Sequence, residues 1–205
     1  GKKLDAVSAR QLYSAVGQAK LINRYFELFR EHKIACGQVL TTKENFGSRT
    51  HYLNQKHCME VMLDNNVIPI VNENDSVSYK EIESEDRLFG DNDMLSSVVS
   101  VLCRAKRLVI FSDIDGFYDS DPRLHPNAKL IKEIRQIDES VYSLAGGAGS
   151  RRGTGGMRTK LQAAELAASQ GIDTIVTNGK HPEALYDIVN GKQAGTLFVG
   201  NKDCL

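Results

Sequence analysis

A glycine-rich run with a basic end is the segment of this sequence best suited to bind phosphate. It is Gly153-Thr-Gly-Gly-Met-Arg-Thr-Lys160, and it stands directly ahead of a helix predicted from about Leu161. Glycines let backbone N–H groups turn toward an anion, and a helix start adds unpaired donors and the positive end of the dipole. The run lacks the Gly-Lys-Ser/Thr ending of a Walker loop. It predicts phosphate binding, with a flexible surface loop as the alternative.

Three polar motifs could supply further contacts. Asn72-Glu-Asn-Asp75 follows an apolar run, Gly90-Asp-Asn-Asp93 opens a predicted helix, and Ser112-Asp-Ile-Asp-Gly-Phe-Tyr-Asp119 follows a second apolar run. Short amide and carboxylate side chains can orient a small substrate or a cation, and they also form ordinary turns and caps. An aspartate at the carboxyl end of a parallel strand is placed for nucleotide or magnesium contact. Each motif alone leaves turn chemistry and function open.

The elements that must position these motifs alternate between helix and strand. A helix with Ser8 as its cap carries the apolar stripe Leu12, Val16, Ala19, Ile22, Phe26 and Phe29. Later helices are predicted over about 48–64, behind 91–93, from 161 and over 182–189, and strands over 34–40, 67–71, 108–112, 172–176 and 196–199. This alternation predicts an α/β fold with a mainly parallel sheet covered on both faces. Ligands bind beyond the carboxyl ends of such strands, which directs attention to 72–78, 112–118 and 177–180.

Composition excludes several other classes of protein. The 205 residues carry 26 basic and 26 acidic side chains, so no net charge favours nucleic acid or an anionic membrane. No apolar run approaches the roughly 20 residues that span a bilayer. The four cysteines are scattered, which is typical of a reducing compartment, and the histidines show no metal or triad spacing. We expect one domain, residues 1–205, of a cytoplasmic protein.

Taken in order, the motifs resemble those of the amino-acid-kinase family, within it the branch that phosphorylates glutamate. The resemblance covers nearly the whole chain and rests on the motifs Ala15-Val-Gly-Gln18, Asp64-Asn-Asn66, Val71-Asn-Glu-Asn-Asp75, Gly90-Asp-Asn-Asp93, Leu108 to Tyr118, Gly153 to Lys160 and Gly195-Thr-Leu-Phe198. It implies transfer of the ATP γ-phosphoryl group to the side-chain carboxylate of L-glutamate, the entry step of proline synthesis. It also implies a three-layer αβα sandwich around a mostly parallel sheet of about eight strands.

The resemblance assigns roles to individual residues. Lys160 would stabilise the transferred group and Asp93 would organise the catalytic lysines. Substrate contacts would come from Asn72, Glu73, Asp75, Asp91 and Asn92. Nucleotide contacts would come from Ser112, Asp113, Thr154, Gly155, Gly156, Met157, Arg158, Thr159 and Lys160. Magnesium would bridge the phosphates, with no ligand residues assigned.

The sequence also departs from the family pattern. Members begin with a strand bearing a Lys-x-Gly-Ser loop, and this sequence starts after it, so we expect the N-terminal part of the kinase domain to be missing. The RNA-modification-like domain at the C-terminal end of many relatives is not expected either. These departures leave two alternatives to a glutamate kinase: a sister kinase with another carboxylate substrate, and a non-catalytic ligand-binding fragment. The family further implies proline as a feedback inhibitor and a homo-oligomer.

Overall fold

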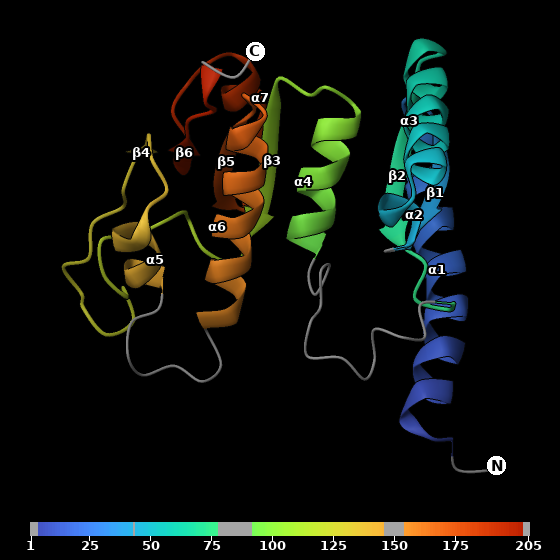
Figure 1. The fold of residues 1–205 in the computed structure, drawn as a ribbon, viewed down its shortest axis with the longest axis horizontal. Helices are drawn as coiled ribbons and strands as arrows, with labels where there is room; N and C mark the ends of the chain where they lie inside the picture. Colours follow the sequence, from blue (N-terminus) through green and yellow to red (C-terminus); the bar gives the residue numbers. More distant parts are fainter. Residues whose placement is uncertain (1–3, 43, 78–91, 146–153, 203–205) are drawn as a thin grey trace. The chain divides into compact units, whose positions relative to one another are not determined.

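The computed structural model describes residues 4–42, 44–77, 92–145 and 154–202. They form two compact units, Gly1–Asn92 and Asp93–Leu205, and each unit has its own sheet (Figure 1). Helix and strand alternate in both units, so the predicted α/β arrangement is confirmed. Among the described residues, the strands of the first unit pair as a sheet of two and those of the second unit as a sheet of four.

The first unit is built around one parallel strand pair. Its elements are α1 (Ala6–Glu31), β1 (Ala35–Thr41), α2 (Glu44–Gly47), α3 (Arg49–Asp64) and β2 (Val67–Glu73). Parallel strands need a crossover connection, and α2 and α3 provide it. The register runs from Ala35 opposite Val67 to Thr41 opposite Glu73. Strand β2 is longer than predicted, so Asn72 and Glu73 are its last two residues instead of the start of a loop.

Helix α1 begins earlier than predicted, and Ser8 is not its cap. Asp5 caps the helix, because its carboxylate accepts hydrogen bonds from the Ser8 backbone N–H at 2.9 Å and from the Ser8 hydroxyl at 2.7 Å. Ser8 therefore lies three residues inside the cap. Of the predicted apolar stripe only Ile22 is buried, while Leu12 and Val16 are each 50% exposed. The predicted helical spacing is confirmed.

The second unit holds the larger sheet. Its elements are α4 (Asn92–Leu102), β3 (Arg107–Ser112), β4 (Glu133–Ile134), α5 (Glu139–Ala145), α6 (Thr154–Ser169), β5 (Asp173–Asn178), α7 (Ala184–Val189) and β6 (Thr196–Phe198). The strand order is β3-β5-β6-β4. The β3–β5 and β4–β6 pairs are parallel and β5–β6 is antiparallel. The prediction of mainly parallel pairing is confirmed in this sheet, with one antiparallel junction.

Helix α6 lies over a buried apolar core. Small side chains dominate its inner face, where Ala163, Ala164 and Ala167 are fully buried together with Leu161. They pack in one cluster with strand residues such as Ile110 of β3, Val176 of β5 and Phe198 of β6. Alanines allow a helix to approach a sheet closely, so the position of α6 over the strands is tightly defined.

The predicted phosphate loop is largely helical. Residues 154–160 form the first two turns of α6, whereas the sequence placed the helix start near Leu161; Gly153 lies outside the described residues. Glycine has low helix propensity, which is why the run Gly153–Gly156 predicted a loop. Burial of Leu161 and the contacts of Lys160 described below favour the helix here, so tertiary interactions override the local preference. The N–H groups of this first turn still lack helical partners.

Candidate active site

An ion pair between Lys160 of α6 and Asp93 of α4 joins these two helices of the second unit. Lys160 Nζ lies 2.8 Å from Asp93 Oδ2, and the two side chains are 14% and 12% exposed. Thr159 Oγ1 lies 3.4 Å from the same carboxylate oxygen and 3.0 Å from the Gly156 carbonyl oxygen. Lys160 Nζ is also 3.4 Å from the Gly156 carbonyl. The carboxylate and the carbonyl therefore orient the ammonium group at the start of α6, as the prediction of an organising Asp93 requires.

Close packing of α4 on α6 sets this distance. Ser97, one helical turn after Asp93, is fully buried and its hydroxyl donates to the Ala163 carbonyl at 2.8 Å. Ala163 lies three residues after Lys160, so the hydrogen bond and the ion pair are stacked along the same helix–helix seam. Small residues at this seam let the helices come near enough for a short lysine–aspartate contact.

The strand ends lie at the same end of this sheet as the helix starts. Helix α4 precedes β3 and α6 precedes β5, and both helices begin at the lower end of the unit in Figure 1. Ser112 is the last residue of β3 and pairs with Asn178, the last residue of β5. Ser112 donates to the Asp113 carboxylate at 3.1 Å, and Asp113 is exposed. This is the edge at which parallel sheets bind ligands.

A second polar cluster at this edge joins Asp115 and Tyr118, both in the predicted 112–119 motif, to Asn178, which had no predicted role. Asn178 donates to Asp115 Oδ1 at 2.7 Å and the Tyr118 hydroxyl donates to Asp115 Oδ2 at 3.1 Å. These two hydrogen bonds, in that order, and the nearby His181 and Lys180 hold the pKa of Asp115 below its ordinary value of 3.8. For Asn178 the only sequence signal was position, since 177–180 follows a predicted strand. The cluster fixes the loop after β3 against the end of β5.

The remaining predicted phosphate contacts point in different directions. A side chain at Gly156 would meet no atom within 4 Å, so the backbone there is accessible to a ligand. Met157 packs against the core. The Arg158 guanidinium lies 5.7 Å from the centre of the Tyr142 ring on α5, and burial followed by a hydrogen bond to Glu165 raises the pKa of Tyr142. Arg158 thus binds an aromatic ring here. Thr154 and Gly155 begin α6, and the Thr154 side chain lies outside the described part.

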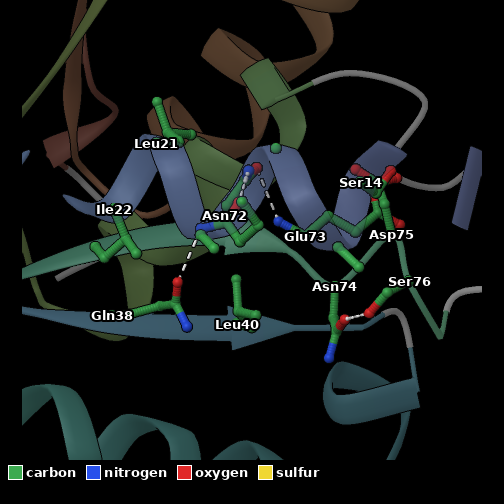
Figure 2. A pocket seen from close by; sticks show the side chains of 14 residues that line it. Ser14, Leu21, Ile22, Gln38, Leu40, Asn72, Glu73, Asn74, Asp75 and Ser76 are labelled. Atoms are coloured by element: carbon green, nitrogen blue, oxygen red, sulfur yellow. Dashed lines mark hydrogen bonds between the residues drawn. The ribbon is translucent and has the colours of Figure 1, made fainter. Parts of the chain in front are cut away.

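The first unit contains a pocket of about 530 Å³ between α1 and the ends of β1 and β2 (Figure 2). Its lining includes three predicted substrate residues, namely Asn72, Glu73 and Asp75. The structure therefore brings these three together. Asp91 lies outside the described residues, and Asn92 is the exposed first residue of α4.

A chain of amide groups crosses this pocket. Asn72 Nδ2 donates to Gln18 Oε1 at 2.9 Å, and Gln18 Nε2 donates to Gln38 Oε1 at 3.0 Å. Asn72 Oδ1 in turn accepts from the Glu73 backbone N–H at 3.0 Å. Figure 2 shows Asn72 near the middle of the pocket and Gln38 toward its left side, on the same side as Ile22. Gln18 belongs to the Ala15–Gln18 motif, but no role was predicted for it, because amides separated by 20 and 54 residues carry no pairing signal.

The turn after β2 is held at both ends. Asn74 N–H donates to the Thr41 carbonyl at 2.7 Å, and the Ser76 hydroxyl donates to Asn74 Oδ1 at 2.6 Å. Asp75 then forms an ion pair with Arg10 of α1, with Nη2 2.6 Å from Oδ1. Sequence reasoning assigned no role to Gln18 or Gln38, which line the pocket, or to Arg10, which contacts its lining residue Asp75.

The described ranges contain neither a preformed metal cluster nor a helix that could span a membrane. Among them, no group of three His, Cys, Asp or Glu side chains is placed to hold a metal ion. Within those same ranges, no helix is long and apolar enough to cross a membrane.

Comparison with known proteins gives consistent similarities. The model of the family described as "Amino acid kinase family" matches residues 2–178. A protein of Bacteroides thetaiotaomicron named glutamate 5-kinase is 54% identical over 92% of this chain and 50% of its own length. A glutamate 5-kinase of Clostridium perfringens is 47% identical over 98% of this chain and 74% of its own. The chain thus spans half the length of the first relative and about three quarters of the second.

Solved structures agree at the level of the fold. An isopentenyl phosphate kinase of T. acidophilum superposes with a TM-score of 0.58 at 18% identity, covering 91% of this chain and 70% of that one. A UMP kinase from Bacillus anthracis gives a TM-score of 0.54 at 15% identity, covering 95% and 66%. At these identities the likeness concerns the fold alone.

Proposed function

We propose that this chain, which belongs to the amino acid kinase family, carries the main part of an enzyme that phosphorylates the side-chain carboxylate of L-glutamate with ATP. The product would be glutamyl 5-phosphate, the first intermediate on the route to proline. The observation that carries the proposal is the 2.8 Å contact between Lys160 and Asp93 at the start of α6. The names of the two relatives described above support glutamate as the acceptor.

Lys160 suits the stabilisation of a phosphoryl group in transfer. Such a transfer needs positioning and stabilisation of charge more than covalent chemistry from the protein. An ammonium group that a carboxylate holds in place beside a helix N-terminus offers a fixed positive charge. Asp93 would be the positioning residue, since it keeps Lys160 charged and oriented.

The acceptor would bind in the first unit's pocket. Asp75 would bind the substrate ammonium, and the amide of Asn72 would bind a carboxylate oxygen. The side-chain carboxylate of glutamate is already ionised at pH 7, because its ordinary pKa is about 4.3. No general base is then required, which fits a pocket without a lining histidine among the described residues.

The nucleotide would bind at the sheet edge of the second unit. Ser112 and Asp113 would contact the nucleoside, and residues 154–160 would face the phosphates. Magnesium would bridge the phosphates, because Mg²⁺ is commonly bound through substrate phosphates and water. When bound, the ion would neutralise phosphate charge. Proline inhibition, a homo-oligomer and a cytoplasmic location are proposed on the resemblance alone.

The test is acceptor-dependent ADP release by the full-length protein. L-glutamate, L-aspartate and N-acetyl-L-glutamate are compared under the same conditions, and hydroxylamine traps the acyl phosphate as a hydroxamate. We expect both signals with glutamate and neither with the other two. Turnover only with aspartate or N-acetylglutamate would show that this compound, and not glutamate, is the acceptor. Nucleotide and glutamate binding without turnover would identify a binding module instead of a kinase.

A further inference from the structure

The ion pair between Arg10 and Asp75 lies at one end of the acceptor pocket. Arg10 Nη2 is 2.6 Å from Asp75 Oδ1, and the side chains are 38% and 31% exposed. The two residues are 65 positions apart, so the contact ties the first turns of α1 to the turn after β2. Gln11 beside it donates to the Ser76 carbonyl at 3.3 Å and strengthens the same connection.

Arg10 belongs to the polar face of α1 that borders the pocket. Ser14 and Gln18 follow it at intervals of four residues, and four-residue spacing places side chains on one helix face. Both Ser14 and Gln18 line the pocket. Figure 2 shows Ser14 and Asp75 at the same end of the pocket. The guanidinium that contacts Asp75 is therefore at the rim of this site.

The charge of the pocket makes this arginine significant. Glu73 and Asp75 are the acidic residues of the lining, and none of the described lining residues is basic. A dicarboxylic amino acid carries two negative groups and one positive group. Two protein carboxylates alone would attract its ammonium and repel both of its carboxylates. Arg10 is the cation placed to offset this repulsion.

We propose that Arg10 is a specificity residue that binds the α-carboxylate of the acceptor while Asp75 binds its α-ammonium group. This inference rests on the proposed function and identifies how the site selects an α-amino acid. The two charges of an α-amino acid are on groups attached to one carbon atom. Protein charges that bind both must lie side by side, as Arg10 and Asp75 do. An arginine fork matches a carboxylate in shape as well as in charge.

Stability alone does not explain the pair. Ion pairs with this degree of exposure contribute little to folding, because solvent screens them and ordering two long side chains costs entropy. Arg24 and Glu27 of the same helix form such a pair at 3.2 Å, with exposures of 65% and 58%. That second arginine, away from the pocket lining, provides a matched control.

The experiment compares Arg10→Gln, Arg10→Lys and Arg24→Gln in the full-length protein. We expect Arg10→Gln to raise KM for L-glutamate by about 10- to 100-fold, the range for a charge-assisted hydrogen bond, with kcat changed less than about threefold. Arg10→Lys should recover part of the loss, because it keeps the charge but not the fork. Arg24→Gln should leave KM unchanged. Thermal unfolding of each variant checks that it is folded.

A competitor that lacks the α-carboxylate distinguishes two roles of Arg10. The first is binding of the α-carboxylate, and the second is positioning of the turn after β2 through the ion pair with Asp75. 4-Aminobutyrate keeps an ammonium and the reacting carboxylate, so its inhibition constant should be unchanged or lower in Arg10→Gln. An equal loss for glutamate and 4-aminobutyrate, or an unchanged KM for glutamate, would overturn the role of Arg10. If the wild type binds a different α-amino acid and Arg10→Gln weakens it, the acceptor is wrong and the inference stands. If the wild-type protein binds no α-amino acid, both the proposed function and the role of Arg10 are wrong.

Discussion

Lys160 of α6 contacts Asp93 of α4 at 2.8 Å, in an environment where each side chain is less than 15% exposed. The contact matters because a lysine with this little solvent has few orientations available. Its ammonium group is held between a carboxylate and the Gly156 carbonyl. A positive charge fixed in this way can act on a phosphoryl group without first reorganising.

Removal of the lysine tests this role directly. Lys160→Ala should lower kcat by about 10²- to 10³-fold, the usual cost of losing one charge-stabilising donor, with a much smaller effect on KM for glutamate. Asp93→Ala combined with Lys160→Ala should lose no more than Lys160→Ala alone, because Asp93 acts through the lysine. Steady-state kinetics of the wild type, Lys160→Ala and the double variant measure these effects. A loss shared equally between kcat and KM would assign Lys160 to acceptor binding.

The same pair should matter for stability. Asp93→Ala leaves a largely buried lysine without its carboxylate, which costs about 3 kcal/mol of unfolding free energy. Asp187→Ala is the matched control, since its pair with Lys192 is also 2.8 Å long but is 52% and 70% exposed. That control should lose much less unfolding free energy, because solvent screens an exposed ion pair. Chemical denaturation compares them, and equal losses would show that burial of the Asp93 pair has no energetic consequence.

The seam between α4 and α6 should tolerate loss of atoms better than their addition. Ser97→Leu places a large side chain against fully buried Ala163 and should cost about 1–3 kcal/mol, while kcat falls because Asp93 and Lys160 are pushed apart. Ser97→Ala loses only the hydrogen bond to the Ala163 carbonyl and should cost about 1 kcal/mol. Thermal unfolding and kinetics check both. Normal turnover in a destabilised Ser97→Leu protein would show that the packing of α4 on α6 does not control the catalytic geometry of Asp93 and Lys160.

Acid stability should depend on Asp115. Its pKa is held below 3.8 mainly by Asn178, so just below that pH the unfolded carboxyl binds a proton while the folded one stays ionised. The contribution is complete above pH 3.8 and is lost as the pH falls through the folded pKa. Asn178→Ala should raise the pKa of Asp115 and so weaken the dependence of the unfolding free energy on pH below 3.8. Carboxyl NMR titration measures it, with Asn190→Ala, which removes only a bond to a backbone carbonyl, as the control.

The sequence predicted the elements better than their ends. Helix α4 follows directly from the spacing of Leu95 and Leu102, which are both buried. The start of α6 was misplaced because its glycines favour a loop, whereas burial of Leu161 and the tertiary contact of Lys160 with Asp93 favour the helix. The two-residue strand β4 and the seven-residue helix α5 were missed, since such short segments carry no periodic pattern.

The site was predictable where its residues are neighbours in the chain. Asn72, Glu73 and Asp75 form one motif and line one pocket. Arg10 and Gln38 reach the same pocket from distant segments, and nothing in the local sequence indicates that they meet. Asp115 and Asn178 are brought together only by the pairing of β3 with β5. Contacts of this kind depend on topology, which a single sequence does not specify in detail.

The amide chain through Gln18 gives the last prediction. Gln18 accepts from Asn72 and donates to Gln38, so its two ends have different roles. Gln18→Glu keeps the shape and the acceptor but removes the donor and adds a negative charge to a pocket that already contains Glu73 and Asp75. We expect KM for glutamate to rise by about tenfold or more through repulsion of its carboxylates, while kcat changes less than about threefold.

The control for this charge change is Gln170→Glu, the same substitution at an exposed residue whose side chain contacts Ser169. It should leave KM unaltered. Raising the salt concentration should reduce the KM effect of Gln18→Glu only slightly, because charges in a partly enclosed pocket are weakly screened. An unchanged KM in Gln18→Glu would place the bound acceptor away from the amide chain, and a loss confined to kcat would place Gln18 beside the reacting atoms.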